Sequence, residues 1–198
     1  MSKAAAQRPA NRRNIILYAT IAAVVVGEIV AVALASRVPQ SAQTINKKAA
    51  IAVGQTAPQF SVATTAGPFD LAAVSTPVVL EVFATWCPHC QHEVPVINAL
   101  SKQYAGKGAI VGVSGSPYGV DGSSPENQAD VMQFVQKLGV TYPVAFDPEL
   151  KVASNYLQGG YPTIVIIDAK KKIRYINDGE VAPADLAKAI DGVLSSAS

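Results

Sequence analysis

Residues 77–90 decide the fold of this 198-residue chain: Pro-Val-Val-Leu-Glu-Val-Phe-Ala-Thr-Trp-Cys-Pro-His-Cys. An apolar run typical of a buried strand leads into Cys87-Pro88-His89-Cys90, which holds the only two cysteines of the sequence. Two cysteines at this spacing, placed where a strand gives way to a helix, indicate a pair that cycles between dithiol and disulfide. The sequence therefore predicts redox chemistry at the two sulfur atoms.

The two cysteines have different expected roles. Only a thiolate attacks a disulfide, and the partial positive charge at a helix N-terminus lowers the pKa of a thiol from about 8.5 to between ~3.5 and ~7.5. We therefore expect Cys87, in the first turn, to be the nucleophile. Cys90, one turn further along, would be shielded and would resolve the mixed disulfide by attacking Cys87.

Three other meanings of the cysteine spacing fit less well. A haem attachment site requires a histidine directly after the second cysteine, where this chain has Gln91. A structural zinc site needs four ligands, and the two histidines, His89 and His92, lie within the same six residues as the cysteines. A purely structural disulfide would close a very small loop and constrain the unfolded chain little. We expect no resident metal and no cofactor besides the redox-active disulfide.

A long apolar segment lies near the N-terminus. From Ile15 to Leu34 the only ionisable residues are Tyr18 and Glu28, and as a helix the segment would be about 30 Å long, enough to cross a bilayer. Four basic residues precede it and three follow before residue 51, so the positive-inside rule places the N-terminus in the cytoplasm. A cleaved signal peptide is the alternative, because Ala33-Leu34-Ala35 resembles a cleavage site. Either way, the remainder would be extracytoplasmic.

Charge divides the chain in the same region. Residues 1–51 contain seven basic residues and one acidic residue, a net charge of +6, whereas the remainder contains nine basic and thirteen acidic residues, a net charge of −4. The second part has no basic patch with interleaved aromatic residues, so nucleic acid is not an expected partner. We predict a cytoplasmic segment (1–14), a transmembrane anchor or signal peptide (15–35), a flexible linker (36–51) and one domain (52–198).

From residue 53 onward, short apolar runs alternate with helical periodicity, which is typical of an α/β sheet with helices on both faces. Val78–Phe83 and Ile110–Val113 are almost entirely apolar, as interior parallel strands are. Thr163–Ile167 and Ile173–Ile176 are predicted to form a hairpin. Three amphipathic helices are expected. The first starts at Cys87 and has an apolar face of Val94, Ile97, Leu100 and Tyr104. The second, between Ser124-Pro125 and Gly139, has a face of Val131, Phe134, Val135 and Leu138, and the third, near the C-terminus, has one of Leu186, Ala189, Ile190 and Val193.

These motifs together resemble the thioredoxin superfamily. Trp86-Cys87-Pro88-His89-Cys90 follows an apolar strand, Pro95 lies eight residues beyond the first cysteine, and Gly160-Tyr161-Pro162-Thr163 precedes another apolar strand. The resemblance implies a thioredoxin-like three-layer sandwich, with a central mixed β-sheet and helices on both faces, over roughly residues 52–195. Pro95 would kink its helix, or the helix would end near Val94.

Other features are similar to the membrane-anchored TlpA/ResA-like branch of that superfamily. They are the opening Gly54-x-x-Ala57-Pro58-x-Phe60, the segment from Ser114 to Asp147 between strand and hairpin, and the N-terminal apolar segment. The dipeptide Pro88-His89, however, resembles that of DsbA-like disulfide donors. The sequence therefore leaves the direction of electron flow open.

The resemblance implies roles for residues on both sides of the cysteines. The bond before Pro162 would be cis and face the cysteines, leaving the backbone of Tyr161 free to pair with a substrate segment as an added strand. A trans proline that simply starts a strand is what the sequence alone favours. Trp86 would shield the disulfide or serve packing alone, and Pro88 and His89 would tune the reduction potential.

Glu81 interrupts an otherwise apolar strand. A carboxylate in such a site is costly to desolvate, so its pKa would rise and it would be a proton acceptor for Cys90. Glu81 also aligns with the buried acid of thioredoxin-like proteins. The alternative is that Glu81 points to solvent on a half-exposed strand, although Val79 and Phe83 share its face.

The predicted function is disulfide exchange, with exported cysteine-containing proteins or apocytochromes and a membrane thiol-disulfide relay protein as partners. Two other classes stay open. A peroxiredoxin shares the fold, but its Pro-x-x-x-Thr-x-x-Cys signature is absent, because Leu80 and Glu81 occupy the upstream positions and Thr85 lies two residues before Cys87. A non-catalytic metallochaperone would retain metal stoichiometrically and show no turnover.

Overall fold

The computed structural model describes residues 51–196, so the predicted cytoplasmic segment, the predicted anchor and nearly all of the predicted linker lie outside the described residues. Within the described range, seven strands form one mixed sheet in the order β2-β1-β5-β4-β3-β6-β7. No helix in this range combines the length and apolarity needed to cross a bilayer. The strands are β1 (Ser61–Thr64), β2 (Gly67–Asp70), β3 (Val78–Phe83), β4 (Ala109–Ser114), β5 (Val144–Phe146), β6 (Thr163–Ile167) and β7 (Ile173–Asp178).

The centre of the sheet is the strand that leads into the cysteine motif. All six residues of β3 are buried, and β3 pairs in parallel with β4 and antiparallel with β6. Parallel strands covered on both faces are apolar along their whole length, which is why the sequence of β3 shows no alternation. The prediction of two interior parallel strands is confirmed, and the structure shows that they are neighbours. The predicted hairpin is also confirmed as β6 and β7, which pair antiparallel.

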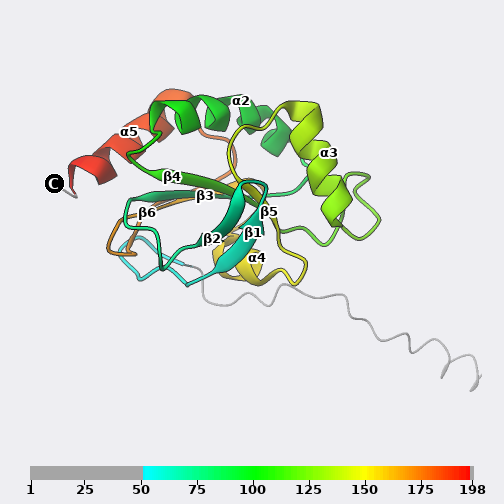
Figure 1. Cartoon of the computed structure of the whole chain (residues 1–198), viewed down its shortest axis with the longest axis horizontal. Helices are drawn as coiled ribbons and strands as arrows, with labels where there is room; N and C mark the ends of the chain where they lie inside the picture. The colour runs from blue at the N-terminus through cyan, green and yellow to red at the C-terminus, as the bar shows by residue number, and fades with distance from the viewer. Residues whose placement is uncertain (1–50, 197–198) are drawn as a thin grey trace, which may run out of the picture. The chain divides into compact units, whose positions relative to one another are not determined.

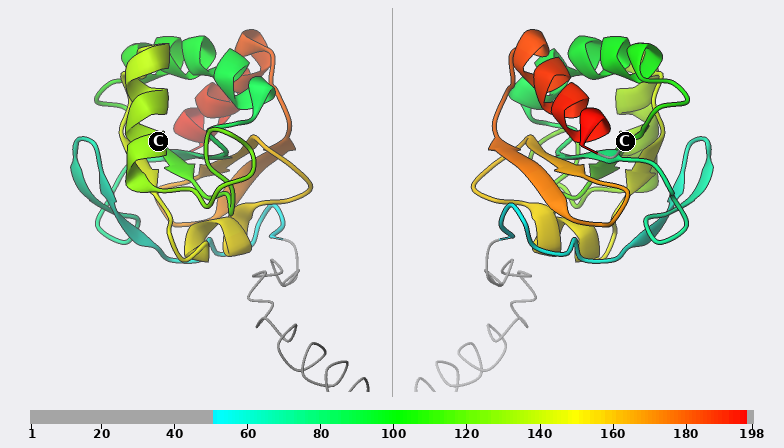
Figure 2. Two further views of the ribbon diagram at one scale, coloured as in Figure 1. Left: turned by 90° about the vertical axis from the view of Figure 1, so that its right-hand side faces the viewer. Right: turned by 90° about the vertical axis from the view of Figure 1, so that its left-hand side faces the viewer.

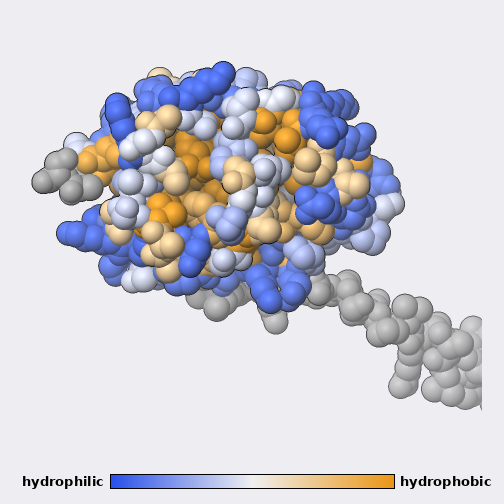
Figure 3. Space-filling view, viewed as in Figure 1, coloured by the Kyte–Doolittle hydropathy of each residue, from blue (hydrophilic) through white to orange (hydrophobic). Residues whose placement is uncertain are grey.

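Helices cover both faces of the sheet (Figures 1 and 2). On one face lie α2 (Pro88–Gln103), α3 (Gln128–Leu138) and α5 (Pro183–Ser195), and on the other lies α4 (Lys151–Tyr156). Side chains of β3 alternate between the two layers, because successive residues of a strand point to opposite faces. Val79 and Phe83 pack with the first layer, whereas Val78, Leu80 and Val82 pack with the second. Figure 3 shows apolar residues gathered between polar outer margins.

Helix α2 positions the cysteines. Cys87 is its N-cap residue and Pro88 its first residue, a position where the missing proline N–H costs nothing. The helix continues past Pro95 to Gln103 and buries Val94, Ile97 and Leu100 against the sheet. The alternative of a helix that ends near Val94 is therefore wrong.

Helix α3 begins later than its sequence suggested. Asn127, rather than Ser124-Pro125, is the N-cap residue, because its side chain accepts hydrogen bonds from the backbone N–H groups of Ala129 and Asp130. The Asp130 side chain in turn accepts from the backbone N–H of Asn127, which completes a capping box. The predicted end is confirmed, since Gly139 adopts the left-handed conformation with a φ of 62°.

Candidate active site

The two cysteines lie at the N-terminal end of α2 and are free thiols in the structure. Cys87 is 5% exposed and Cys90 is fully buried, so the first cysteine is the more accessible of the two. Burial raises the pKa of the Cys90 thiol well above its ordinary value, and Glu81, when it is ionised, raises it further. This arrangement supports the predicted division of roles, because a client disulfide can reach Cys87 more easily and a thiol with a raised pKa is a weak nucleophile at neutral pH.

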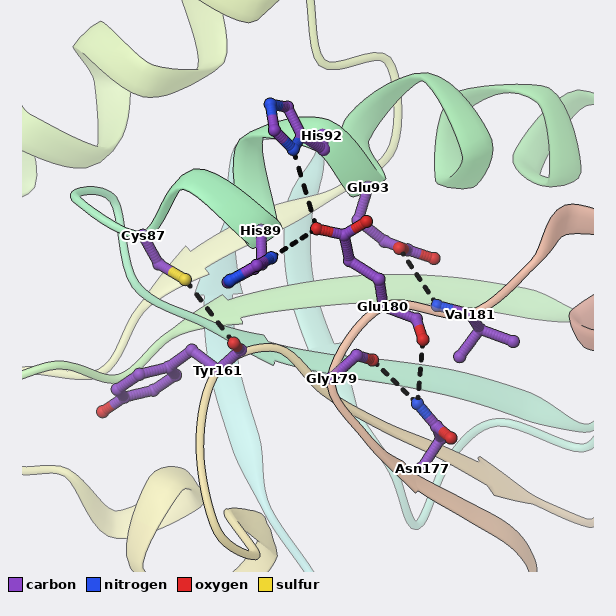
Figure 4. A network of polar contacts seen from close by, with 9 residues as sticks. All are labelled: Cys87, His89, His92, Glu93, Tyr161, Asn177, Gly179, Glu180 and Val181. Carbon is purple, nitrogen blue, oxygen red and sulfur yellow. Dashed lines mark hydrogen bonds and ion pairs between the residues drawn. The ribbon is translucent and has the colours of Figure 1, made fainter.

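The loop before β6 lies against the nucleophile. The peptide bond between Tyr161 and Pro162 is cis, as the family resemblance implied. The thiol of Cys87 donates a hydrogen bond to the carbonyl oxygen of Tyr161 at 3.5 Å (Figure 4). Without a substrate, the carbonyl oxygen of Tyr161 thus accepts from Cys87, and pairing of this backbone with a substrate segment stays a prediction.

Glu81 is buried, so the alternative of a solvent-facing side chain is wrong. It points to the same face of β3 as Val79 and Phe83, which pack in the same cluster as Cys90. Burial raises the pKa of Glu81 to about 8, although a hydrogen bond from the hydroxyl of Tyr142, 2.9 Å away, partly offsets the increase. At neutral pH, most molecules therefore carry a protonated Glu81.

Space for this carboxyl comes from the neighbouring strand. Gly112 of β4 lies directly opposite Glu81 in the parallel register. A Cβ atom at Gly112 would lie 2.9 Å from the ring of Tyr142, closer than van der Waals contact permits. A glycine at this position thus makes room for both the acid and the phenol that binds it.

A second buried carboxylate, Glu93, was missed by the sequence prediction. It is 2% exposed, and its Oε2 accepts a hydrogen bond from the backbone N–H of Val181 at 3.3 Å. Its Oε1 has no hydrogen-bond partner among residues 51–196, and burial raises its pKa. The available signal was its spacing, because a residue three positions after Cys90 lies on the same face of a helix.

Trp86 lies on the surface beside the nucleophile and is 37% exposed. Its indole N–H donates to the hydroxyl of Ser116 at 2.8 Å, and its ring meets that of Tyr161 edge to face at 6.0 Å. Two contacts therefore fix the indole against the loop that follows β4 and against the loop of Pro162. Trp86 therefore lies outside the core, and shielding of the disulfide stays a prediction.

The strand end before Trp86 is held by a carboxylate from the segment between β4 and α3. One oxygen of Glu126 accepts hydrogen bonds from the hydroxyl groups of Thr85, at 2.9 Å, and Ser114, at 2.8 Å. These contacts join the ends of β3 and β4 next to the cysteine motif. The sequence offered no signal for this role.

His89 and His92 both approach Glu180, which follows β7 (Figure 4). The Nδ1 atom of His89 lies 2.5 Å from Oε1 of Glu180, and that of His92 lies 3.6 Å from the same oxygen. Both imidazoles are mostly exposed, as expected for His92. Within residues 51–196, no three histidine, cysteine or acidic side chains are arranged to hold a metal ion.

Comparison with known proteins places this site in a family. The AhpC/TSA family model matches residues 53–176. The chain is 32% identical over 152 residues to the thioredoxin-like protein YneN of Bacillus subtilis, an alignment that covers 75% of this chain and 85% of that protein. It is 27% identical to the thiol-disulfide oxidoreductase ResA of Geobacillus thermodenitrificans, over 77% of this chain and 84% of ResA.

A solved structure shows the same architecture. A thiol:disulfide interchange protein of the thioredoxin family, from Chlorobium tepidum, superimposes with a TM-score of 0.56 at 27% sequence identity. The match covers 73% of this chain and 99% of that one. The predicted α/β sandwich with a central mixed sheet is thereby confirmed for the described domain. The chain belongs to the AhpC/TSA family and has a thioredoxin-like fold.

Proposed function

We propose that this protein is a membrane-tethered, extracytoplasmic thiol-disulfide oxidoreductase that exchanges disulfides with exported proteins through Cys87 and Cys90. The observation that carries the proposal is the pairing of a nearly buried thiol at the N-cap of α2, the more accessible of the two, with a fully buried thiol one turn later. The relatives named above are thiol-disulfide oxidoreductases or thioredoxin-like proteins, which favours exchange over the peroxidase and metallochaperone alternatives.

The exchange proceeds in two balanced steps. The Cys87 thiolate attacks a client disulfide, forming a mixed disulfide while the second client sulfur leaves as a thiolate. Cys90 then loses its proton and attacks the Cys87 sulfur, which releases the reduced client and leaves an intramolecular disulfide. In its ionised form Glu81 accepts the Cys90 proton, and in its protonated form it returns a proton when the steps run backwards.

Location and partners are proposed from the N-terminal sequence. The apolar segment from Ile15 to Leu34 would tether the domain, and the basic residues before it would keep the N-terminus in the cytoplasm. Clients would then be exported cysteine-containing proteins or apocytochromes, and a membrane thiol-disulfide relay protein would reset the pair. The redox-active disulfide is the only cofactor that this scheme needs.

Trapping of the intermediate tests the proposal. Cys90→Ser should accumulate mixed disulfides with a cysteine-containing client, visible as reducible high-mass species on non-reducing gels, because the resolving thiol is missing. Cys87→Ser should accumulate none. If the adducts form through Cys90 when Cys87 is replaced, or if neither variant forms them, the assigned roles are wrong.

The direction of exchange is a separate measurement. The equilibrium of the Cys87–Cys90 pair with glutathione reports its reduction potential. A value near that of DsbA, about −120 mV, would indicate a disulfide donor, and a value near that of thioredoxin, about −270 mV, would indicate a reductase.

A further inference from the structure

The loop after β7 carries a carboxylate to the histidine of the cysteine motif. Oε1 of Glu180 lies 2.5 Å from Nδ1 of His89, although the two residues are 91 positions apart in the chain. The same oxygen lies 3.6 Å from Nδ1 of His92. In the view of Figure 4, the His89 ring lies between this carboxylate and the sulfur of Cys87, with its second ring nitrogen on the sulfur side.

Glu180 is held in place by its neighbours in the chain. The backbone N–H of Gly179 donates to the carbonyl oxygen of Pro162 at 2.8 Å, and the side chain of Asn177 donates to the carbonyl oxygen of Gly179 at 2.7 Å. On the other side, the backbone N–H of Val181 donates to the buried carboxylate of Glu93 in α2. The loop is thus tied to the cis-proline segment and, through the contact of Val181 with Glu93 drawn in Figure 4, to the helix that carries the cysteines.

The contact with Glu180 fixes the state of one ring nitrogen. The hydrogen bond with His89 lowers the pKa of Glu180, so its carboxylate is ionised at neutral pH and can only accept hydrogen bonds. Nδ1 of His89 must therefore carry a proton. Whether the ring is neutral or protonated, the carboxylate adds one negative charge beside it. The carboxylate therefore offsets part of any positive charge that His89 presents to Cys87.

We propose that Glu180 is a positioning residue of the active site that orients His89 and offsets its charge, so that the Cys87–Cys90 disulfide is a weaker oxidant than the Pro88-His89 dipeptide alone would make it. This inference rests on the proposed function and bears on the direction of exchange. It also explains how a donor-like dipeptide can occur in a chain whose relatives include ResA.

The redox step shows why the charge matters. Reduction of the disulfide takes two electrons from a dithiol or from two molecules of a monothiol, and it breaks the sulfur–sulfur bond. Cys90 then ends as a thiol, and Cys87 ends as a thiol or, after losing its proton, as a thiolate. A positive charge beside Cys87 stabilises the thiolate and with it the reduced pair, and a negative charge disfavours both. The Glu180 carboxylate therefore shifts the equilibrium toward the disulfide.

The test uses the full chain in detergent, equilibrated at pH 8 with mixtures of reduced and oxidised glutathione. Glu180→Gln keeps an acceptor for His89 but removes the charge, and we expect the equilibrium constant for reduction to rise about twofold to fivefold, since both side chains are partly exposed. The increase should shrink in 1 M salt, because screening weakens interactions between exposed charges. Glu149→Gln is the matched control, because Glu149 is an exposed carboxylate paired with Lys151.

Two further variants separate positioning from charge. His92→Ala should leave the equilibrium constant unchanged. If His92→Ala shifts the constant more than Glu180→Gln does, the assignment to His89 is overturned. In the reduced wild-type protein, ring ¹⁵N chemical shifts should show Nδ1 of His89 protonated, and Glu180→Ala should remove this preference. A Glu180→Gln equilibrium equal to that of Glu149→Gln would overturn the proposal. If the wild-type pair does not exchange with glutathione at all, the proposed function fails instead.

Discussion

Glu81 is an acid whose folded environment favours its protonated form. Burial raises its pKa from 4.5 to about 8, so between these values the folded state holds a proton that the unfolded state has released. The unfolding free energy therefore falls as pH rises from about 4.5 to about 8. Below about pH 4, Glu81 is protonated in both states and does not lower it. The difference amounts to a cost on the order of 4 kcal/mol at pH 8.

Glu81→Gln should remove this pH dependence while preserving an acceptor for Tyr142. From pH 4.5 to pH 8, the unfolding free energy of wild type should fall by on the order of 4 kcal/mol because of Glu81, and the variant should lack this fall. Urea denaturation at the two pH values measures the change, with the exposed Glu149→Gln as the control. Parallel stability curves for Glu81→Gln and wild type would contradict the assigned protonation state.

At the residue scale, the sequence was most informative where chemistry is local. The cysteine motif, Glu81 and the cis-proline segment were predicted because each stands out against an apolar run or matches a known motif. Glu93 and Glu180 were missed because each looks like an ordinary surface acid in the sequence. Their roles depend on the loop after β7 meeting α2, a contact that no local pattern encodes.

At the scale of single elements, the N-terminus of α3 shows how a cap stabilises a helix. Asn127 and Asp130 form a reciprocal capping box there. Asn127→Ala should destabilise the protein by about 1 kcal/mol, because two backbone N–H groups lose their acceptor. Denaturant titration measures this loss. Asn127→Ser should retain most of the stability, and Gln136→Ala, at an exposed site of the same helix, should change it by less than about 0.5 kcal/mol. Equal losses for Asn127→Ala and Gln136→Ala would contradict the role of the cap.

Length explains which elements the sequence predicted. The interior strands, the hairpin and the three amphipathic helices each have enough residues for a periodic pattern to show. Strand β5 has three residues, and β1 and β2 have four each, so none of them forms such a pattern. Helix α4 has six residues, and its N-cap residue, Leu150, is in a left-handed conformation and offers no side-chain cap. The side chain of Asp147 instead accepts hydrogen bonds from the first backbone N–H groups of the helix. Strand β5 is defined by its pairing with β4 and β1, and α4 by the Asp147 contacts and its packing on the sheet.

At the scale of the whole molecule, the proposed tether is open to direct measurement. The full chain should sediment with membranes and resist extraction at high salt, whereas a chain that starts at residue 51 should remain in the supernatant with an unchanged glutathione equilibrium. The physical reason is the apolar length of Ile15–Leu34. Recovery of the full chain in the supernatant would contradict the anchor, and a mature N-terminus directly after Ala35 would assign the segment to a cleaved signal peptide.

The hydrogen bond between Cys87 and Tyr161 makes the availability of one backbone acceptor depend on oxidation state. A thiol has a proton to donate to that carbonyl oxygen, and a disulfide has none. Oxidation of the pair therefore vacates the acceptor, which an incoming polypeptide can then use for its own N–H. When the pair has oxidised a polypeptide and is itself reduced, the Cys87 thiol can donate to this oxygen once more. The thiol then competes with the N–H of the bound polypeptide, which favours its departure.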